Sequence, residues 1–219
     1  MNLPFTQEQF FDEIAAYNMA VWPAQYILTL IAVAIVVLVI RGPERAGRLV
    51  SYGLALLWCW IAVAYHLAFF WSINPAAPFF AAVSLAAAGA FAWFGGIRGE
   101  LQFKKGLSVT ATVGLVVVMF ALVGYPAVGE YIGHSYPAAP TFGLPCPTTI
   151  FTFGILLMAV PGFHKAIVVA PLVWAVIGST AAFTLGVTQD LGLVVVALVG
   201  AYMLVRAAPA SQSLQDRRL

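Results

Sequence analysis

Charged side chains are scarce in this chain of 219 residues. Asp, Glu, Lys and Arg make up 8% of the sequence, whereas hydrophobic residues make up 63%. A soluble globular domain carries roughly 25% charged residues. The composition therefore excludes an ordinary soluble domain, and the length leaves room for about seven membrane spans of ~20 residues with no separate soluble domain.

Cysteine is also scarce, since the chain has only Cys59 and Cys146. Two cysteines are too few for a disulfide framework. Cys59 lies in the middle of an apolar segment, about 12 residues or ~18 Å of helix from the membrane surface where Cys146 is expected. Because a disulfide needs Cα atoms within ~7 Å, we expect two free thiols.

The first 20 residues do not fit the pattern of a signal peptide, so we expect none there. Met1–Ala20 carries three acidic residues and no Lys or Arg, and it has no short apolar core before a cleavage site. Thr6 and Gln9 fit a capping box at the start of a short amphipathic helix within Leu3–Asn18. Residues 1–21 then form an outer interfacial segment that lies on the membrane, or simply the extramembrane start of the first span. Both interpretations stay open.

Seven apolar segments follow, and they predict an all-α integral membrane protein with a single helical domain over residues 1–206. The fifth segment has about 13 residues and spans a bilayer only if it extends back into Leu144–Pro147 or if the bilayer thins around it. The segments are Trp22–Ile40, Leu49–Trp71, Ala76–Gly96, Leu107–Gly124, Thr148–Val160, Ala166–Val187 and Leu191–Val205.

The distribution of positive charge supports seven spans. With this count all ten Lys and Arg residues fall on one side of the membrane. Cytoplasmic loops carry the excess of Lys and Arg. The pattern predicts an N-terminus and a 125–147 loop that face outward, and a cytoplasmic tail at residues 207–219. Aromatic residues typical of an outer interface belt support the same orientation: Trp22, Trp71, Tyr125, Tyr131 and Tyr136.

The order of the segments suggests an internal repeat. Trp22–Ile27 opens the first segment much as Cys146–Phe151 opens the fifth, and each is followed by a basic turn and two further apolar segments. This parallel three-plus-one-plus-three layout resembles the SWEET transporters, in topology alone. The third segment, Ala76–Gly96, is rich in Ala, Ser and Gly, which allow close helix approach, so we expect it at the centre of the bundle.

Cys146 is the most specific candidate for chemistry because Pro145 and Pro147 flank it. These prolines favour a non-helical backbone at Cys146, just before a helix start whose dipole favours a thiolate. A thiolate there is a ligand for a soft metal ion such as Cu(I), with His134 and Met158 as further candidate ligands. The alternative is a structural role, with Pro147 at the first helical turn and Cys146 as a small apolar side chain that fills space. No metal cluster motif decides between them.

His66 is the one clearly ionisable side chain deep inside a predicted span. Such residues usually face the interior of a helix bundle and serve a function. Helical spacing places Cys59, Ala62 or Val63, His66 and Phe70 on one face. The histidine then serves proton coupling or substrate contact, or it is a neutral side chain bonded to a neighbouring helix.

Acidic residues and threonines complete the candidates for binding or transport. The acids form the ring of an entrance or simply a solvated face, and they are Glu8, Asp12, Glu13, Glu130 and Asp190. Thr148, Thr149 and Thr152 line a pathway or bond back to their own helix. No lysine lies inside a span, which excludes a retinal Schiff base.

Three stretches carry a resemblance to a known family: PCPTTIFTFG at 145–154, LPFTQEQF at 3–10 and VWPAQY at 21–26. Together they are similar to a family of uncharacterised bacterial membrane proteins classed only as a domain of unknown function. The resemblance covers nearly the whole chain. It implies a multi-pass protein of the bacterial inner membrane and nothing about substrate.

These observations favour a small permease or an ion-handling protein, with Cys146 and His134 at the mouth of the pathway and His66 deeper. The alternative is a non-catalytic membrane subunit or sensor that binds a partner through the 125–147 loop. A membrane enzyme that uses Cys146 is least favoured, and no catalytic residue is predicted. The expected surroundings are the lipid bilayer and a small molecule or ion, without nucleic acid; oligomeric state stays open.

Overall fold

The computed structural model describes residues 3–104, 106 and 108–206, so the predicted tail at 207–219 lies outside the described residues. This part of the chain is helical, and it contains no strand beyond one isolated bridge between Phe142 and Leu144. The α-helices are α1 (Gln7–Ala20), α2 (Ala24–Arg41), α3 (Ala46–Trp60), α4 (Ala77–Ala90), α5 (Val109–Met119), α6 (Tyr125–Tyr131), α7 (Pro145–Met158), α8 (Ala166–Leu185) and α9 (Leu191–Arg206).

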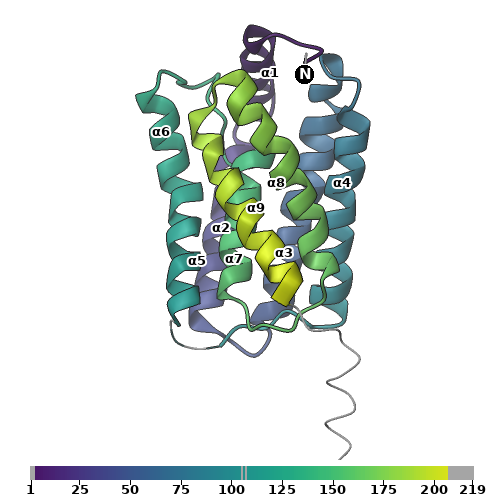
Figure 1. Ribbon diagram of the computed structural model, residues 1–219, viewed down its shortest axis with the longest axis vertical. Helices are drawn as coiled ribbons and strands as arrows, with labels where there is room; N and C mark the ends of the chain where they lie inside the picture. The colour runs from purple at the N-terminus through teal and green to yellow at the C-terminus, as the bar shows by residue number, and fades with distance from the viewer. Residues whose placement is uncertain (1–2, 105, 107, 207–219) are drawn as a thin grey trace, which may run out of the picture.

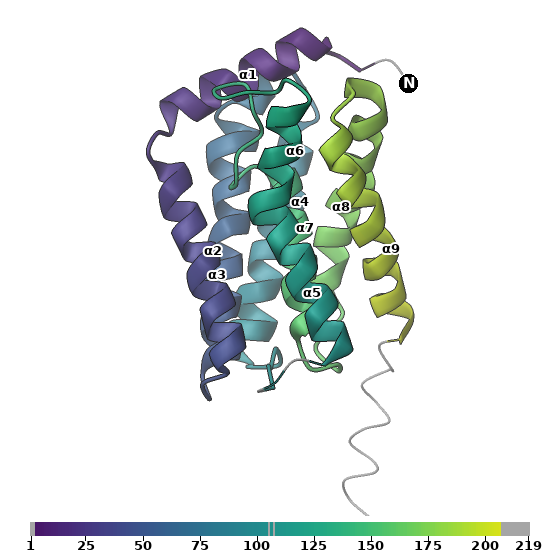
Figure 2. The ribbon, with the colours of Figure 1, turned by 90° about the vertical axis from the view of Figure 1, so that its left-hand side faces the viewer.

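Several helices continue through tighter or wider turns. The π-helical segments η1 (Ile61–Leu67), η3 (Phe91–Ile97) and η4 (Phe120–Gly124) extend α3, α4 and α5, and η4 joins α5 to α6. The 3-10 turns are η2 (Phe70–Ser72) and η5 (Thr188–Asp190). The long helices run side by side in an upright bundle (Figures 1 and 2).

Six helical segments within the described residues are long and apolar enough to cross a membrane, as in a multi-pass membrane protein. They are Ala24–Arg41, Ala46–Ser72, Ala77–Ile97, Val109–Tyr131, Ala166–Leu185 and Thr188–Val205. They correspond to six of the seven predicted segments. The remaining one, α7, has 14 residues, or ~21 Å of helix, which is shorter than the ~30 Å hydrocarbon core of a bilayer.

Helix α7 lies inside the bundle. All of its residues except Cys146 and Leu157 are buried, and it contacts α2, α3, α5, α8 and α9. The prediction that the third segment is central was wrong: α4 lies at the side of the bundle in Figure 1 and exposes Phe79 and Leu85. The small residues of α4 do serve close packing, against α3 and α8.

Glycines allow a close helix crossing between α5 and α7. A Cβ atom added at Gly114 would lie 2.5 Å from the carbonyl oxygen of Gly154, and one added at Gly154 would lie 2.9 Å from the carbonyl oxygen of Gly114. Small residues allow such an approach where lipid supplies no hydrophobic driving force between helices.

Helix α1 lies across one end of the bundle, which we call the α1 end (Figure 2). The predicted capping box is confirmed: Gln9 N donates to Thr6 Oγ1 at 3.2 Å and Thr6 N donates to Gln9 Oε1 at 2.8 Å. Tyr17 anchors the helix, since its buried hydroxyl accepts a hydrogen bond from Trp60 Nε1 at 2.8 Å. Burial raises the pKa of Tyr17 to about 12, so the phenol stays protonated.

The segment between α6 and α7 folds back onto α1 through Asn18. The Asn18 Nδ2 atom donates to the carbonyl oxygens of Pro137 and Ala139 at 2.6 and 2.8 Å, and Thr141 Oγ1 donates to Asn18 Oδ1 at 2.7 Å. Asn18 itself is fully buried. Together α1 and this segment cover the end of the bundle away from the α2–α3 turn and the α7–α8 loop (Figure 2).

Candidate functional site

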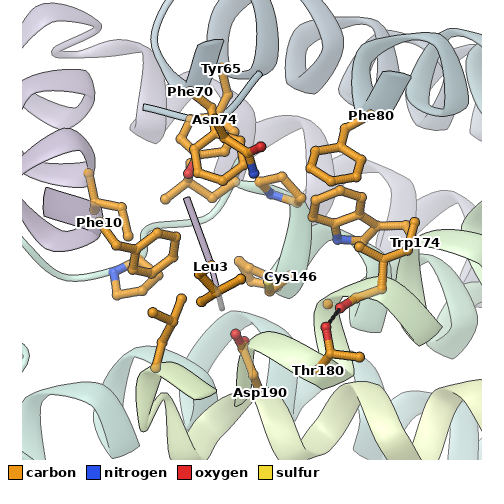
Figure 3. Close-up of a pocket in the computed structure, with 18 of the residues that line it drawn as sticks. Leu3, Phe10, Tyr65, Phe70, Asn74, Phe80, Cys146, Trp174, Thr180 and Asp190 are labelled. Atoms are coloured by element: carbon orange, nitrogen blue, oxygen red, sulfur yellow. Dashed lines mark hydrogen bonds between the residues drawn. The ribbon is translucent and has the colours of Figure 1, made fainter. Parts of the chain in front are cut away.

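A cavity of ≈ 200 Å³ lies beneath α1 at the α1 end. It is lined by the N-terminal segment and α1, by the η1–η2 region and the start of α4, and by the facing ends of α6, α7, α8 and η5. Most of the lining is apolar and aromatic. Figure 3 shows Phe10, Tyr65, Phe70, Phe80 and Trp174 around the central space.

Asp190 places a carboxyl group in this apolar wall. Its side chain points into the cavity (Figure 3), and the residue is only 1% exposed. The Tyr125 hydroxyl donates a hydrogen bond to Asp190 Oδ1 at 2.5 Å. Asp190 directly precedes α9, and the N-terminal end of a helix stabilises a negatively charged group. The backbone therefore favours a carboxylate at this position. The interpretation of Asp190 as part of a solvated face was therefore wrong.

Cys146 borders the same space, in the first turn of α7. The prediction of a non-helical backbone there was wrong, because α7 begins at Pro145 and tolerates prolines in its first turn, where their missing N–H has no helical partner. The Cys146 thiol interacts with the Asp190 carboxyl group. A carboxylate neighbour repels a thiolate, which offsets the helix dipole. Both cysteines are free thiols, as predicted.

Trp174 forms the wall opposite α1. A Cβ atom added at Gly178 would lie 3.5 Å from Trp174 Nε1 and 3.8 Å from Cys146 Sγ, so the two polar atoms border one small region. The indole N–H is buried, and it lies beside the thiol of Cys146, which is a weak hydrogen-bond acceptor; no stronger acceptor bonds to it among the described residues. A ligand atom that accepts a hydrogen bond there would satisfy this donor better.

His66 lies behind the aromatic wall. Its ring centroid is 4.9 Å from that of Trp174 and 5.8 Å from that of Phe80. The residue is fully buried, and neither ring nitrogen has a hydrogen-bond partner among the described residues. The expected bond to a neighbouring helix is therefore absent from the described structure.

The predicted common face of Cys59 and His66 was also wrong. Cys59 is exposed on the outside of the bundle, whereas Ala62 and His66 are buried. The π-helical segment η1 (Ile61–Leu67) is the physical reason. Its wider turn rotates the following side chains relative to an α-helix of 3.6 residues per turn, so spacing alone misplaces them.

The three threonines of α7 divide into two kinds. Thr149 and Thr152 donate to the carbonyl oxygens of Pro145 and Thr148, at 2.7 and 2.8 Å, which is the back-bonding alternative. Thr148 is buried outside the cavity lining, and its hydroxyl has no partner among the residues that the structure describes. It is the threonine left available to a ligand or to water.

His134 and Glu130 do not line the cavity. His134 packs on Phe11, with ring centroids 4.3 Å apart, and burial lowers its pKa. Glu130 is exposed and accepts a hydrogen bond from Ser135 Oγ at 2.9 Å.

Met158, a further candidate ligand for a soft metal ion, lies at the far end of α7, ~18 Å of helix from Cys146. Within the described residues, no group of three His, Cys, Asp or Glu could hold a metal ion, so the soft-metal site stays a prediction.

The sequence interpretation missed several residues of the site. Tyr125 was assigned to the interface belt, yet it is buried and bonded to Asp190, while Trp22, Trp71, Tyr131 and Tyr136 are exposed as expected. Trp174 and Tyr65 were not singled out. One signal was available: each is an amphipathic aromatic residue inside an apolar segment, where its polar atom needs a partner.

No curated protein and no solved structure matches this sequence. The profile of a family of unknown function, DUF6064, matches residues 7–214. This match covers α1 and all of the residues that line the cavity except Leu3 and Phe5. The chain therefore belongs to the DUF6064 family.

Proposed function

We propose that this protein is a small permease of the bacterial inner membrane and that the cavity at the α1 end is its outer binding site. The observation that carries the proposal is the buried Asp190 carboxyl group at the edge of an otherwise apolar cavity of ≈ 200 Å³. Ligand sites are typically apolar pockets with a few convergent polar groups. Ionisable residues inside membrane bundles usually mark ligand or ion pathways.

Further polar groups lie inside the bundle near the cavity. Among the described residues, both ring nitrogens of His66, Ser84 Oγ and Thr148 Oγ1 are buried without hydrogen-bond partners, and Trp174 Nε1 has only the weakly accepting Cys146 thiol beside it. Buried polar groups normally have a protein or water partner, so such a cluster supports a pathway that admits water or solute. The π-helical segment that carries His66 fits the same role, because π-bulges are frequent at functional sites.

The proposal includes a seven-span topology with the N-terminus outside. A central α7 need not match the thickness of the bilayer, because surrounding helices shield its ends from lipid. Positive residues such as Arg41, Arg98 and Lys165 flank the helix ends opposite α1, as expected for a cytoplasmic face. The two triplets of the predicted repeat are then α2–α4 and α7–α9, joined by α5 and α6.

A second candidate is a membrane subunit that binds a partner through the outer segment. Tyr131 is 91% exposed and Tyr136 is 54% exposed, and aromatic side chains are enriched at protein interfaces. This candidate predicts a co-purifying protein that is lost when both tyrosines are replaced by serine. A soft-metal carrier has less support, since Cys146 and His134 face different surroundings.

Accessibility of Cys146 from the two sides of the membrane tests the permease proposal. In a Cys59→Ala background reconstituted in liposomes, a small membrane-impermeant thiosulfonate would be added outside or trapped inside. Alternating access predicts that Cys146 reacts from both sides. Reaction from the α1 side alone supports a receptor or subunit, and absence of reaction from either side contradicts an accessible site.

A further inference from the structure

We infer that the cavity at the α1 end binds an organic ammonium ion, a protonated amine carried on an apolar body. This inference rests on the proposed binding site and names the class of its ligand. It depends on three features of the described structure: a buried carboxyl group without a cationic partner, aromatic walls, and acidic surroundings.

The first feature is the missing counter-charge of Asp190. The residue is 1% exposed, and the residues that line the cavity include no Lys, Arg or His. The Tyr125 hydroxyl donates a hydrogen bond to Asp190, and the Cys146 thiol borders the same cavity; neither group carries positive charge. A buried carboxylate is costly unless it is paired and hydrogen-bonded. An ammonium group in the cavity supplies both the charge and the donors.

The second feature is the aromatic wall. Tyr65 and Phe70 stack with ring centroids 5.4 Å apart, and Phe80 meets Trp174 edge to face, also at 5.4 Å. All four line the cavity around the space in front of Asp190 (Figure 3). Aromatic faces attract cations, most strongly those of Trp and Tyr, and they also bury an apolar body.

The walls favour an organic cation over a bare metal ion. Ca²⁺ and Mg²⁺ require six or more oxygen ligands, or retained water. Asp190 is the one carboxyl group that lines the cavity, and most other lining groups are hydrocarbon. An ammonium on an apolar body loses little hydration and gains contacts with these walls.

The third feature is the charge around the entrance. The described acids at the α1 end include Glu8, Asp12 and Glu13 on α1 and Glu130 near the end of α6. The described Lys and Arg residues instead belong to the turns and helix ends away from α1. A surface of one sign raises the local concentration of ligands of the opposite sign.

Matched probes test the inference. Calorimetric titration of the full-length protein in lipid nanodiscs would compare 2-phenylethylamine, 2-phenylethanol and 3-phenylpropionate, which share a body and differ in charge. We expect the amine to bind at least about tenfold more tightly than the alcohol, a difference of about 1.4 kcal/mol, and the carboxylate not to bind. Asp190→Asn, nearly isosteric, should remove the preference for the amine and leave binding of the alcohol unchanged.

Two further variants keep the test decisive. Glu44→Gln removes an exposed carboxylate in the α2–α3 turn, at the end of the bundle opposite α1, and should leave the amine affinity unchanged. Trp174→Leu should weaken the amine more than the alcohol, and it serves if Asp190→Asn does not yield a monodisperse protein. Equal binding of amine and alcohol, or an amine affinity that survives Asp190→Asn, overturns the inference while the cavity remains a binding site. Failure of all three probes to bind overturns both the inference and the proposed binding site.

Discussion

At the scale of single residues, Asn18 is the side chain that closes the α1 end. It makes three short hydrogen bonds to the segment that follows α6. Asn18→Ala leaves the carbonyl groups of Pro137 and Ala139 without these donors, and each lost bond costs about 0.5–1.5 kcal/mol. We therefore expect the free energy of unfolding in detergent to fall by about 2–4 kcal/mol.

Ser135→Ala is the matched control for this change. The Ser135 side chain makes an exposed hydrogen bond to Glu130, and loss of that bond should cost less than about 0.5 kcal/mol. The comparison is made by denaturant or thermal unfolding followed by near-ultraviolet circular dichroism. Equal effects of the two variants would show that Asn18 does not hold the segment in place.

The folding stability of the protein should depend on pH through His134, which lies at the same end. Burial against Phe11 lowers the pKa of His134 below the ordinary histidine value of about 6.5. The unfolded chain therefore binds a proton at a higher pH than the folded one, and stability falls as pH drops below about 6.5. The melting temperature of the wild type should fall more between pH 7.5 and 5.5 than that of His134→Gln. If the melting temperatures of the wild type and His134→Gln fall equally with pH, His134 is not the cause of the pH dependence.

Sequence reasoning at this scale succeeded where the cause was local. The Thr6–Gln9 capping box and the absence of a disulfide follow from neighbouring residues or helix length, and both predictions are confirmed. The environment of Asp190 was misjudged because its burial depends on Tyr125 and Cys146. These residues lie 65 and 44 positions away in the sequence, and no local pattern joins them.

At the scale of the elements, the contact between α5 and α7 holds the central helix. Gly114→Ala would place a methyl group 2.5 Å from the carbonyl oxygen of Gly154. Because this oxygen belongs to the backbone, it cannot move away without a loss of stability. We expect a loss of about 1–3 kcal/mol in the free energy of unfolding. Gly89→Ala on α4 is the control, because nothing lies within 4 Å of its added methyl group.

Alanine favours a helix over glycine by up to about 1 kcal/mol, so Gly89→Ala should be neutral or stabilising. The two variants would be compared by thermal unfolding in one detergent. Similar melting temperatures for Gly114→Ala and Gly89→Ala would contradict the close crossing.

The apolar segments predicted most of the helices because hydrophobic length is a strong signal in membrane proteins. Which side chains of each segment face the interior of the bundle was harder to predict from the sequence. The π-helical segment Ile61–Leu67 rotates His66 away from the face of Cys59, and composition alone does not reveal this. The central position of α7 was also missed, because its burial comes from contacts with five other helices, which the composition of α7 alone does not show.

At the scale of the whole molecule, the seven-span proposal requires α7 to carry the chain across the membrane. Single cysteines at Glu44, Ser135 and Pro161, in a Cys59→Ala and Cys146→Ser background, would report the side of each loop. Glu44 lies between α2 and α3, and Pro161 lies between α7 and α8. We expect an impermeant maleimide to label Ser135→Cys in intact spheroplasts and the other two only after lysis. Labelling of Pro161→Cys before lysis would contradict the crossing by α7.

The most direct measurement of the central claim is ligand protection of Cys146, which borders the cavity beside Asp190. The rate of Cys146 alkylation would be measured in the Cys59→Ala protein with increasing 2-phenylethylamine or 2-phenylethanol. A binding site for ammonium ions predicts saturable protection by the amine, weaker protection by the alcohol, and loss of that difference in Asp190→Asn. A rate that neither compound changes would contradict the assignment of this cavity as the binding site.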